Sequence, residues 1–305
     1  MSAIWGIIHL DDREADYNQG IKMEQAMNLY KLDRCLTFKK ENAVFGCGLQ
    51  YITEEAINEK LPCYDTKNKL FYTADCMLDN REELVEKLSQ LNERMPDLYD
   101  HHECRESSID SKDRKRSEDG KEDRKGSHPL HLDERIPDGT LLYQAYLAWG
   151  RRFTDHVLGA FSLVIYDEQK KSCILFTDHT GNRSLYYCIA EQTIYFATVF
   201  APLLAVLPKA YTRLNEKWMV ACELDTTPIM EFYPELTPFQ EIHQVLPGHS
   251  VTVLLNGSRM EINENCYWGF HRSKPLKFRT QEEYRELFIK TLNECVTSVL
   301  RSRKN

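Results

Sequence analysis

Short runs of β-branched and aromatic residues, separated by polar turns, are the feature that most limits the folds open to this chain. Runs of this kind cover residues 3–9, 43–51, 69–76, 160–166 and 172–177. Two further pairs of runs predict β-hairpins, at 185–189 with 193–197 and at 250–255 with 259–262. Because many strands follow one another without a helix between them, the pattern predicts an α+β layered domain and not a series of βαβ units.

Three segments have the apolar spacing of helices. Leu84, Leu88 and Leu91 recur at helical intervals after an acidic start. Residues 140–150 carry a wide apolar face, and residues 281–300 are amphipathic. Helices inserted between long strand runs agree with the same layered class.

Composition and charge exclude several classes of protein. The chain has 305 residues, of which 42% are hydrophobic and 28% charged, as is ordinary for a globular protein. No apolar run approaches the length of about 18–20 residues that a membrane helix needs, and a formal charge of −8 argues against general nucleic-acid binding. The start of the sequence lacks a basic region followed by an apolar one, so we predict a cytoplasmic location.

Composition changes sharply from about residue 96 to residue 136. Between Glu103 and Ser127 the only aliphatic residue is Ile109, and the stretch contains no aromatic residue. Such a segment cannot bury enough apolar surface to offset its ordering entropy, so we predict a disordered surface insertion. It also carries residues of the types that bind zinc: His101, His102, Cys104, His128 and His131. Their spacing matches no zinc-finger pattern, so we expect no metal site.

The sequence begins Met1-Ser2, and Ser2 is a candidate nucleophile. Removal of Met1 would leave Ser2 with a free α-amine, whose pKa of about 7.7–8.0 makes it a usable base at neutral pH. A nucleophile and its base on one residue is the arrangement of an N-terminal nucleophile. Serine is also a common second residue with no chemical role. The remaining motifs of the chain must therefore distinguish a catalytic Ser2 from a serine without such a role.

Seven segments occur in one order over residues 1–270 and together carry a family resemblance. They are residues 1–6, 75–84, 137–149, 158–167, 177–187, 242–249 and 266–268. The chain resembles the N-terminal glutaminase-type domain of the asparagine synthetase family, which belongs to the class II glutamine amidotransferases. The sequence of residues 78–84 is most similar to the corresponding segment of lasso-peptide cyclases and β-lactam synthetases. The resemblance implies the four-layer αββα sandwich of N-terminal-nucleophile hydrolases.

The resemblance also implies a division of the chain. Residues 1–270 would form the glutamine amidotransferase type 2-like domain. Residues 271–305 would be a linker and the first helix of a synthetase domain. The Ser-Gly-Gly-x-Asp-Ser loop by which such a domain holds pyrophosphate is absent. We therefore expect no cofactor in this chain, and ATP and magnesium only in the synthetase domain.

Active members of the family use an N-terminal cysteine, which attacks the glutamine carboxamide. The resemblance places Ser2 at that position and Asp75-Cys76 at the Asn-Gly pair that forms the oxyanion hole. A carboxylate cannot donate as an amide does, and its charge repels an oxyanion. In active members of the family an arginine binds the carboxylate of the substrate. The resemblance places it near residues 48–50, where this chain has no arginine. Asp138 matches the amine-binding aspartate, although the helix it precedes makes an N-cap the preferred interpretation.

These departures predict a degenerate, catalytically inactive domain, a pseudoenzyme that supports a synthetase domain of an ATP-dependent amide ligase. The alternatives are an active glutamine-hydrolysing asparagine synthase domain, an amidohydrolase using Ser2, and a non-catalytic interaction module. The expected partners are a synthetase domain, in the same chain or another, and a second copy of the chain; glutamine is expected only if the site is active. The apolar stripe over residues 287–299 would be a docking face unless it packs on its own domain.

Overall fold

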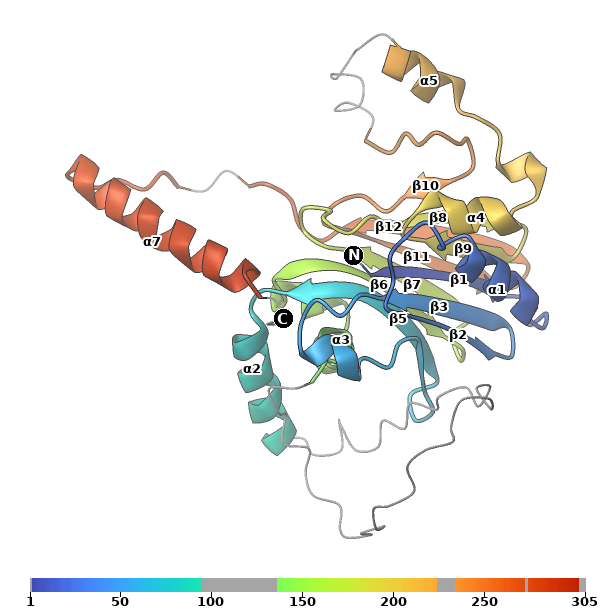
Figure 1. Ribbon diagram of the computed structural model, residues 1–305, viewed down its shortest axis with the longest axis horizontal. Helices are drawn as coiled ribbons and strands as arrows, with labels where there is room; N and C mark the ends of the chain where they lie inside the picture. Colours follow the sequence, from blue (N-terminus) through green and yellow to red (C-terminus); the bar gives the residue numbers. More distant parts are fainter. Residues whose placement is uncertain (1, 95–135, 224–233, 272–273, 302–305) are drawn as a thin grey trace.

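The computed structural model describes residues 2–94, 136–223, 234–271 and 274–301. Two antiparallel six-stranded sheets lie at its centre (Figure 1). The first has the order β10-β8-β9-β1-β3-β2, with β1 (Ala3–His9), β2 (Arg34–Lys40), β3 (Ala43–Leu49), β8 (Tyr186–Ala190), β9 (Thr193–Ala197) and β10 (His243–Gln244). The second has the order β12-β11-β7-β6-β5-β4, with β4 (Cys63–Asp65), β5 (Leu70–Leu78), β6 (Gly159–Asp167), β7 (Ser172–Thr177), β11 (His249–Asn256) and β12 (Arg259–Cys266).

Helices cover the outer faces of the two sheets. The first sheet is covered by α1 (Tyr17–Gln25), which packs on β1 and on α4 (Phe200–Val206). On the second sheet, α3 (Asp138–Trp149) packs on β5 and on α2 (Arg81–Arg94). Helix α5 (Glu216–Glu223) and helix α7 (Gln281–Val299) extend from this body (Figure 1). The molecule is therefore the predicted αββα sandwich.

Strand β1 has no polar side chain before His9, because both of its faces are covered. Ile4 and Ile8 point into the core between the sheets, whereas Trp5 and Ile7 join the second cluster, beneath α1 and α4. Successive side chains of a strand alternate between its faces, so a strand covered on both sides reads as a continuous apolar run. Its partners β3 and β9 pair with it on either side and hold its position.

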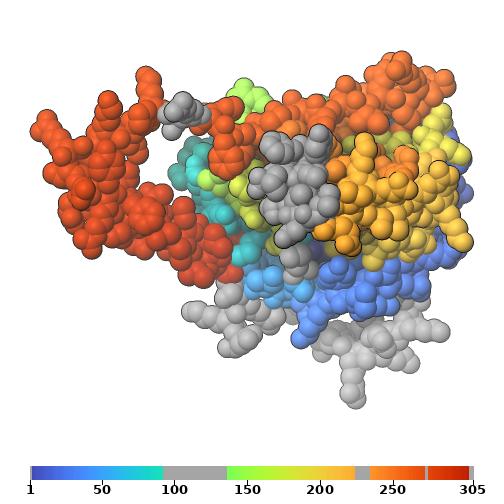
Figure 2. Space-filling view, turned by 90° about the horizontal axis from the view of Figure 1, so that it is seen from above, coloured from blue at the N-terminus to red at the C-terminus, as the bar shows by residue number. Residues whose placement is uncertain are grey.

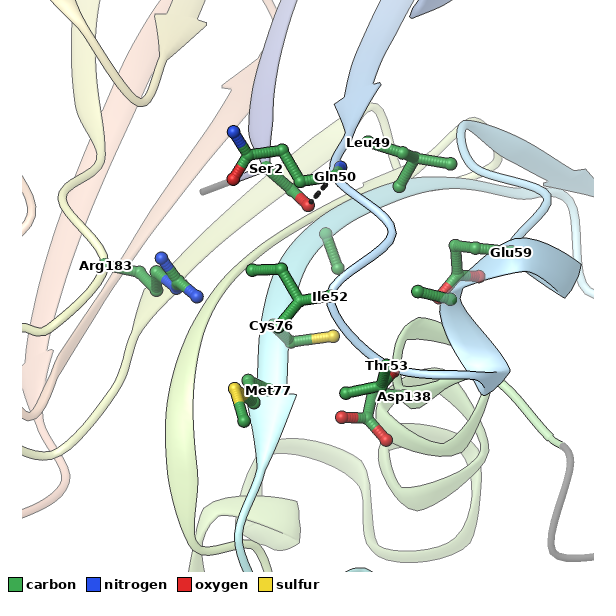
Figure 3. A pocket seen from close by; sticks show the side chains of 12 residues that line it. Ser2, Leu49, Gln50, Ile52, Thr53, Glu59, Cys76, Met77, Asp138 and Arg183 are labelled. Atoms are coloured by element: carbon green, nitrogen blue, oxygen red, sulfur yellow. Dashed lines mark hydrogen bonds between the residues drawn. The ribbon is translucent and has the colours of Figure 1, made fainter. Parts of the chain in front are cut away.

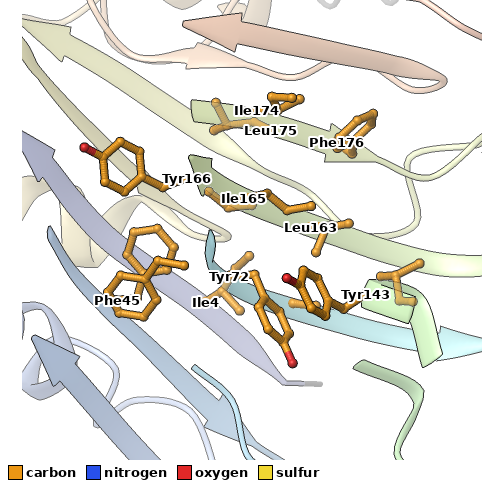
Figure 4. Packing of buried hydrophobic residues seen from close by; sticks show 14 of the residues in the cluster. Ile4, Phe45, Tyr72, Tyr143, Leu163, Ile165, Tyr166, Ile174, Leu175 and Phe176 are labelled. Atoms are coloured by element: carbon orange, nitrogen blue, oxygen red, sulfur yellow. The ribbon is translucent and has the colours of Figure 1, made fainter. Parts of the chain in front are cut away.

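Aromatic residues fill the space between the sheets (Figure 4). Phe45 of β3 stacks on Phe71 of β5, with ring centroids 4.0 Å apart. Tyr72 of β5 faces outward and stacks on Tyr143 of α3 at 3.8 Å, which attaches the helix to the sheet. This packing fixes the amino end of α3, and Asp138 with it, relative to β5.

The predicted elements agree with the structure, with small shifts in their bounds. Helix α3 begins at Asp138 and not at Thr140, whereas α1 and β2 were not predicted from the sequence. The predicted insertion lies mostly outside the described residues, as do the histidines and the cysteine weighed for zinc. Within the described residues, no helix is long and apolar enough to cross a membrane. The domain boundary near residue 270 stays a prediction.

Candidate active site

A small pocket opens where strands of both sheets end near the start of α3 (Figure 3). Its cavity volume is about 40 Å³. The lining comes from the start of β1, the segment after β3, the strand β5, the start of α3 and the loop after β7: Ser2, Leu49, Gln50, Ile52, Thr53, Ala56, Glu59, Ala74, Cys76, Met77, Asp138 and Arg183. Three of the four residues singled out from the sequence, Ser2, Cys76 and Asp138, therefore meet at one place.

Ser2 directly precedes β1 and is half-buried at the pocket. Its Oγ accepts a hydrogen bond from the backbone N–H of Gln50 at 3.3 Å. A second, adjoining hollow of about 100 Å³ is lined by Ser2 together with Asp75 and Arg183. The fourth predicted residue, Asp75, therefore lies beside the same serine.

Asp75 is a buried residue inside β5, opposite Ser162 of β6. Its Oδ1 lies 3.6 Å from Nε of Arg183, and neither of these atoms has a hydrogen-bond partner. Burial raises the pKa of Asp75 to about 6, against the attraction of Arg183. At neutral pH this carboxyl is mostly ionised, so it presents a negative charge next to Ser2 and not a donor.

Cys76 follows on the same strand and is half-buried. Desolvation, with the negative charges of Asp138 and Glu59, raises the pKa of its thiol well above the usual range. The thiol therefore stays protonated at neutral pH and is not an activated nucleophile.

Asp138 is the first residue of α3, and its carboxylate does not cap that helix. The N-cap residue is Pro137, so the preferred interpretation of Asp138 as a cap was wrong. Instead its oxygens accept hydrogen bonds from outside the helix: from Leu78 N at 2.9 Å, from Arg81 Nη1 at 2.8 Å and from Arg301 Nη2 at 2.6 Å. Asp138 is thus a buried anion held between two guanidinium groups.

Glu59 is a pocket residue that the sequence did not indicate. Its Oε2 accepts a hydrogen bond from Gly139 N at 2.9 Å, at the amino end of α3. Burial, together with the nearby negative charge of Asp138, raises the pKa of Glu59 to about 7. The chain thus places a second carboxyl group beside the first turn of the helix, where a negative charge is favourable.

Arg183 was also missed as a site residue, although it lies inside the motif of residues 177–187. Residues 48–50 indeed carry no arginine, and Gln50 occupies the pocket there. The guanidinium of Arg183 reaches the pocket from the opposite side, from the loop after β7 (Figure 3). The pocket therefore has a cationic group, supplied by a different element from the one that the resemblance implied.

Comparison with known proteins agrees with this architecture. Residues 134–268 match a family model described as a glutamine amidotransferase domain. "Amidase chyE" of Penicillium rubens is 27% identical over 161 residues, which cover 52% of this chain and 22% of that protein. "Asparagine synthetase [glutamine-hydrolyzing] 3" of Bacillus subtilis is 23% identical over 151 residues, which cover 47% of this chain and 22% of that protein. The matches span about a fifth of these relatives.

A solved structure of glutamine phosphoribosylpyrophosphate amidotransferase from Bacillus subtilis is 12% identical, with a TM-score of 0.47, over 86% of this chain and 48% of that one. The family match over residues 134–268 and the layered fold agree with each other: this part of the chain is similar to a glutamine amidotransferase domain. The chain is also related to asparagine synthetase and to amidases.

Proposed function

We propose that this domain has lost glutaminase activity and acts in the cytoplasm as a scaffold for a synthetase domain of an amide ligase. The observation that carries the proposal is the buried carboxylate of Asp75 beside Ser2. An oxyanion is stabilised by donors aimed at it, and loss of one donor typically costs about 10²–10³ in rate. An ionised carboxylate at this place goes further, because it repels the charge that forms.

The nucleophile position gives a second reason. A serine hydroxyl is much harder to ionise than a thiol, so Ser2 would need more help from its surroundings. Its Oγ instead accepts a hydrogen bond from Gln50 N, and among the described residues its hydroxyl donates no hydrogen bond to a side chain that could act as a base.

The scaffold part of the proposal rests on the family relation and on α7. None of its residues is buried, and its apolar side chains are exposed: Leu287, Phe288, Leu292, Val296 and Val299. This exposure supports a docking face over the alternative that the stripe packs on its own domain. An exposed apolar face of this kind suits a partner domain.

Incubation of the purified protein with L-glutamine, followed by measurement of glutamate, tests the loss of activity. We expect the wild type and Ser2→Ala to release the same background amount. Glutamate release by the wild type that Ser2→Ala abolishes would overturn the proposal in favour of an active Ser2 amidohydrolase. Co-purification with a protein that carries a Ser-Gly-Gly-x-Asp-Ser loop would support the scaffold role, and absence of such a partner would favour a different interaction module.

A further inference from the structure

Helix α7 touches the body of the domain with its carboxyl-terminal end. None of its residues is buried, and in Figure 2 most of the helix stands away from the sandwich. Two open hollows lie beside its last turns. One is shared with the start of α2, through Arg81 and Glu83 among others, and the other with His179 and Trp268. The end of the helix therefore rests over partly empty space and not on a packed surface.

Arg301, just beyond α7, makes the closest polar contact between this end and the body. Its Nη2 donates to Oδ2 of Asp138 at 2.6 Å, and the side chains of the pair are only 21% and 9% exposed. By contrast, Arg285 in the first half of α7 pairs with Glu282 of the same helix, and both are largely exposed. The contact of Arg301 is thus the partly buried ion pair that attaches this helix to the pocket wall.

The geometry of the contact is incomplete on the side of the arginine. Nε and Nη1 of Arg301 are buried and have no hydrogen-bond partner. A guanidinium has five N–H donors, and buried donors without partners cost free energy. The ion pair holds the end of the helix, but it leaves two buried donors of Arg301 unpaired. Arg301 is therefore released more easily than an arginine whose donors are all paired.

The carboxylate that holds Arg301 also faces the pocket next to Ser2. It accepts three hydrogen bonds, from Leu78, Arg81 and Arg301, and an ionised carboxylate has about four acceptor positions. A cationic group in the pocket would therefore use the same charge as Arg301. The carboxyl groups of Asp138, Glu59 and Asp75 border the pocket or the adjoining hollow, against the guanidinium of Arg183 among the same lining residues, and this balance favours a cation.

We propose that Arg301 and Asp138 form a latch that holds the end of α7 over the pocket, and that a small organic cation bound in the pocket, a primary ammonium or a guanidinium, releases it. Binding and release are reciprocal, because the two groups compete for one carboxylate. Occupancy of the pocket thereby changes the freedom of α7, the helix with the exposed apolar face. The latch does not require glutamine hydrolysis, so it stands or falls separately from the proposed loss of activity.

Hydrogen exchange measured by mass spectrometry on the full chain tests the latch. We expect amides in residues 292–299 to exchange about fivefold faster in Arg301→Ala, because the end of the helix loses its anchor. Arg285→Ala, which removes an exposed arginine of the same helix, is the matched control and should leave these amides unchanged. Arg301→Lys keeps the charge and should retain most of the protection. Exchange of peptides from β6 reports whether each variant is folded.

The ligand part of the proposal is tested with methylguanidinium chloride, against sodium chloride at the same concentration. The wild type should lose protection over residues 292–299 with methylguanidinium only, and Arg301→Ala should show no further change. Equal effects of the two salts would overturn the competition. Equal exchange of the wild type and Arg301→Ala, in folded proteins, would overturn the latch itself.

Discussion

Two buried aspartates, both close to Arg183, have opposite surroundings. Asp178 follows β7 and is fully buried. Its oxygens accept hydrogen bonds from five donors: Phe161 N at 3.2 Å, Thr180 N at 3.0 Å, Thr180 Oγ1 at 3.2 Å, Asn182 N at 3.0 Å and Arg183 N at 2.9 Å. Asp75 in β5 faces the guanidinium of Arg183 at 3.6 Å, and its Oδ1 has no hydrogen bond.

The difference separates the role of a residue in the fold from its role in the site. Asp178 organises the turn that includes Gly181, whose φ of +72° suits glycine and whose missing side chain leaves room for Pro247. The fold depends on that turn whether or not the domain has a reaction to perform. Asp75 does not accept a comparable set of hydrogen bonds from a turn. Residues of the pocket can therefore change without a change in the framework of strands and turns.

The largest expected effect is that of Asp178→Ala. The substitution removes the shared acceptor of five hydrogen bonds, among them that of the buried N–H of Phe161, so we expect the free energy of unfolding to fall by about 3–5 kcal/mol. Urea unfolding followed by circular dichroism measures this. A loss below about 1 kcal/mol would mean that the turn keeps its shape without the carboxylate, and the contrast with Asp75 would disappear.

Glu59→Gln should have the next largest effect, and one that depends on pH. The folded pKa of about 7 lies above the unfolded value, so the protonated carboxyl stabilises the fold at low pH and this contribution is lost as the pH rises to 7 and beyond. Between pH 5 and pH 8 the wild type should therefore lose about 3 kcal/mol through this group, and Glu59→Gln should not. Thermal or urea unfolding at the two pH values distinguishes them; parallel pH profiles would contradict the raised pKa.

Asp75→Asn should have a smaller effect, of the opposite sign to that of Asp178→Ala. Burial of the charged carboxyl outweighs its attraction to Arg183, so the folded pKa of about 6 makes the ionised form unfavourable above that pH. We expect Asp75→Asn to raise the free energy of unfolding at pH 8 by about 1 kcal/mol, and by less at pH 5. Asp178→Asn is the control and should be destabilising at both pH values. Equal losses in the two variants would show that Asp75 belongs to the framework as well.

Most of the framework could be predicted from the sequence because its signals are local. The apolar run of β1 and the Asn256-Gly257 turn between β11 and β12 identify their elements without knowledge of distant residues. Helix α1 and strand β2 were not predicted. Their apolar residues are few, and their burial comes from packing on β1 and β3.

Residues of the site could be predicted only where they lie in motifs that carry the family resemblance. Ser2, Asp75, Cys76 and Asp138 were recognised by their positions in motifs, and the structure brings them together. Glu59 and Arg301 carry no local signal. Charged residues are ordinarily exposed, so only the tertiary structure reveals that these two reach the pocket or its wall from segments far apart in the chain.

The position of Trp5 on β1 has a spectroscopic consequence. This indole is fully buried and lies so close to Gly46 that a Cβ there would meet its ring at 2.0 Å, whereas Trp149, Trp218 and Trp268 are partly exposed. Indole emission moves to shorter wavelength in apolar surroundings. The blue edge of the fluorescence of this protein should therefore come from Trp5, three residues from Ser2. It offers an optical signal for the integrity of the sheet that holds the serine in place.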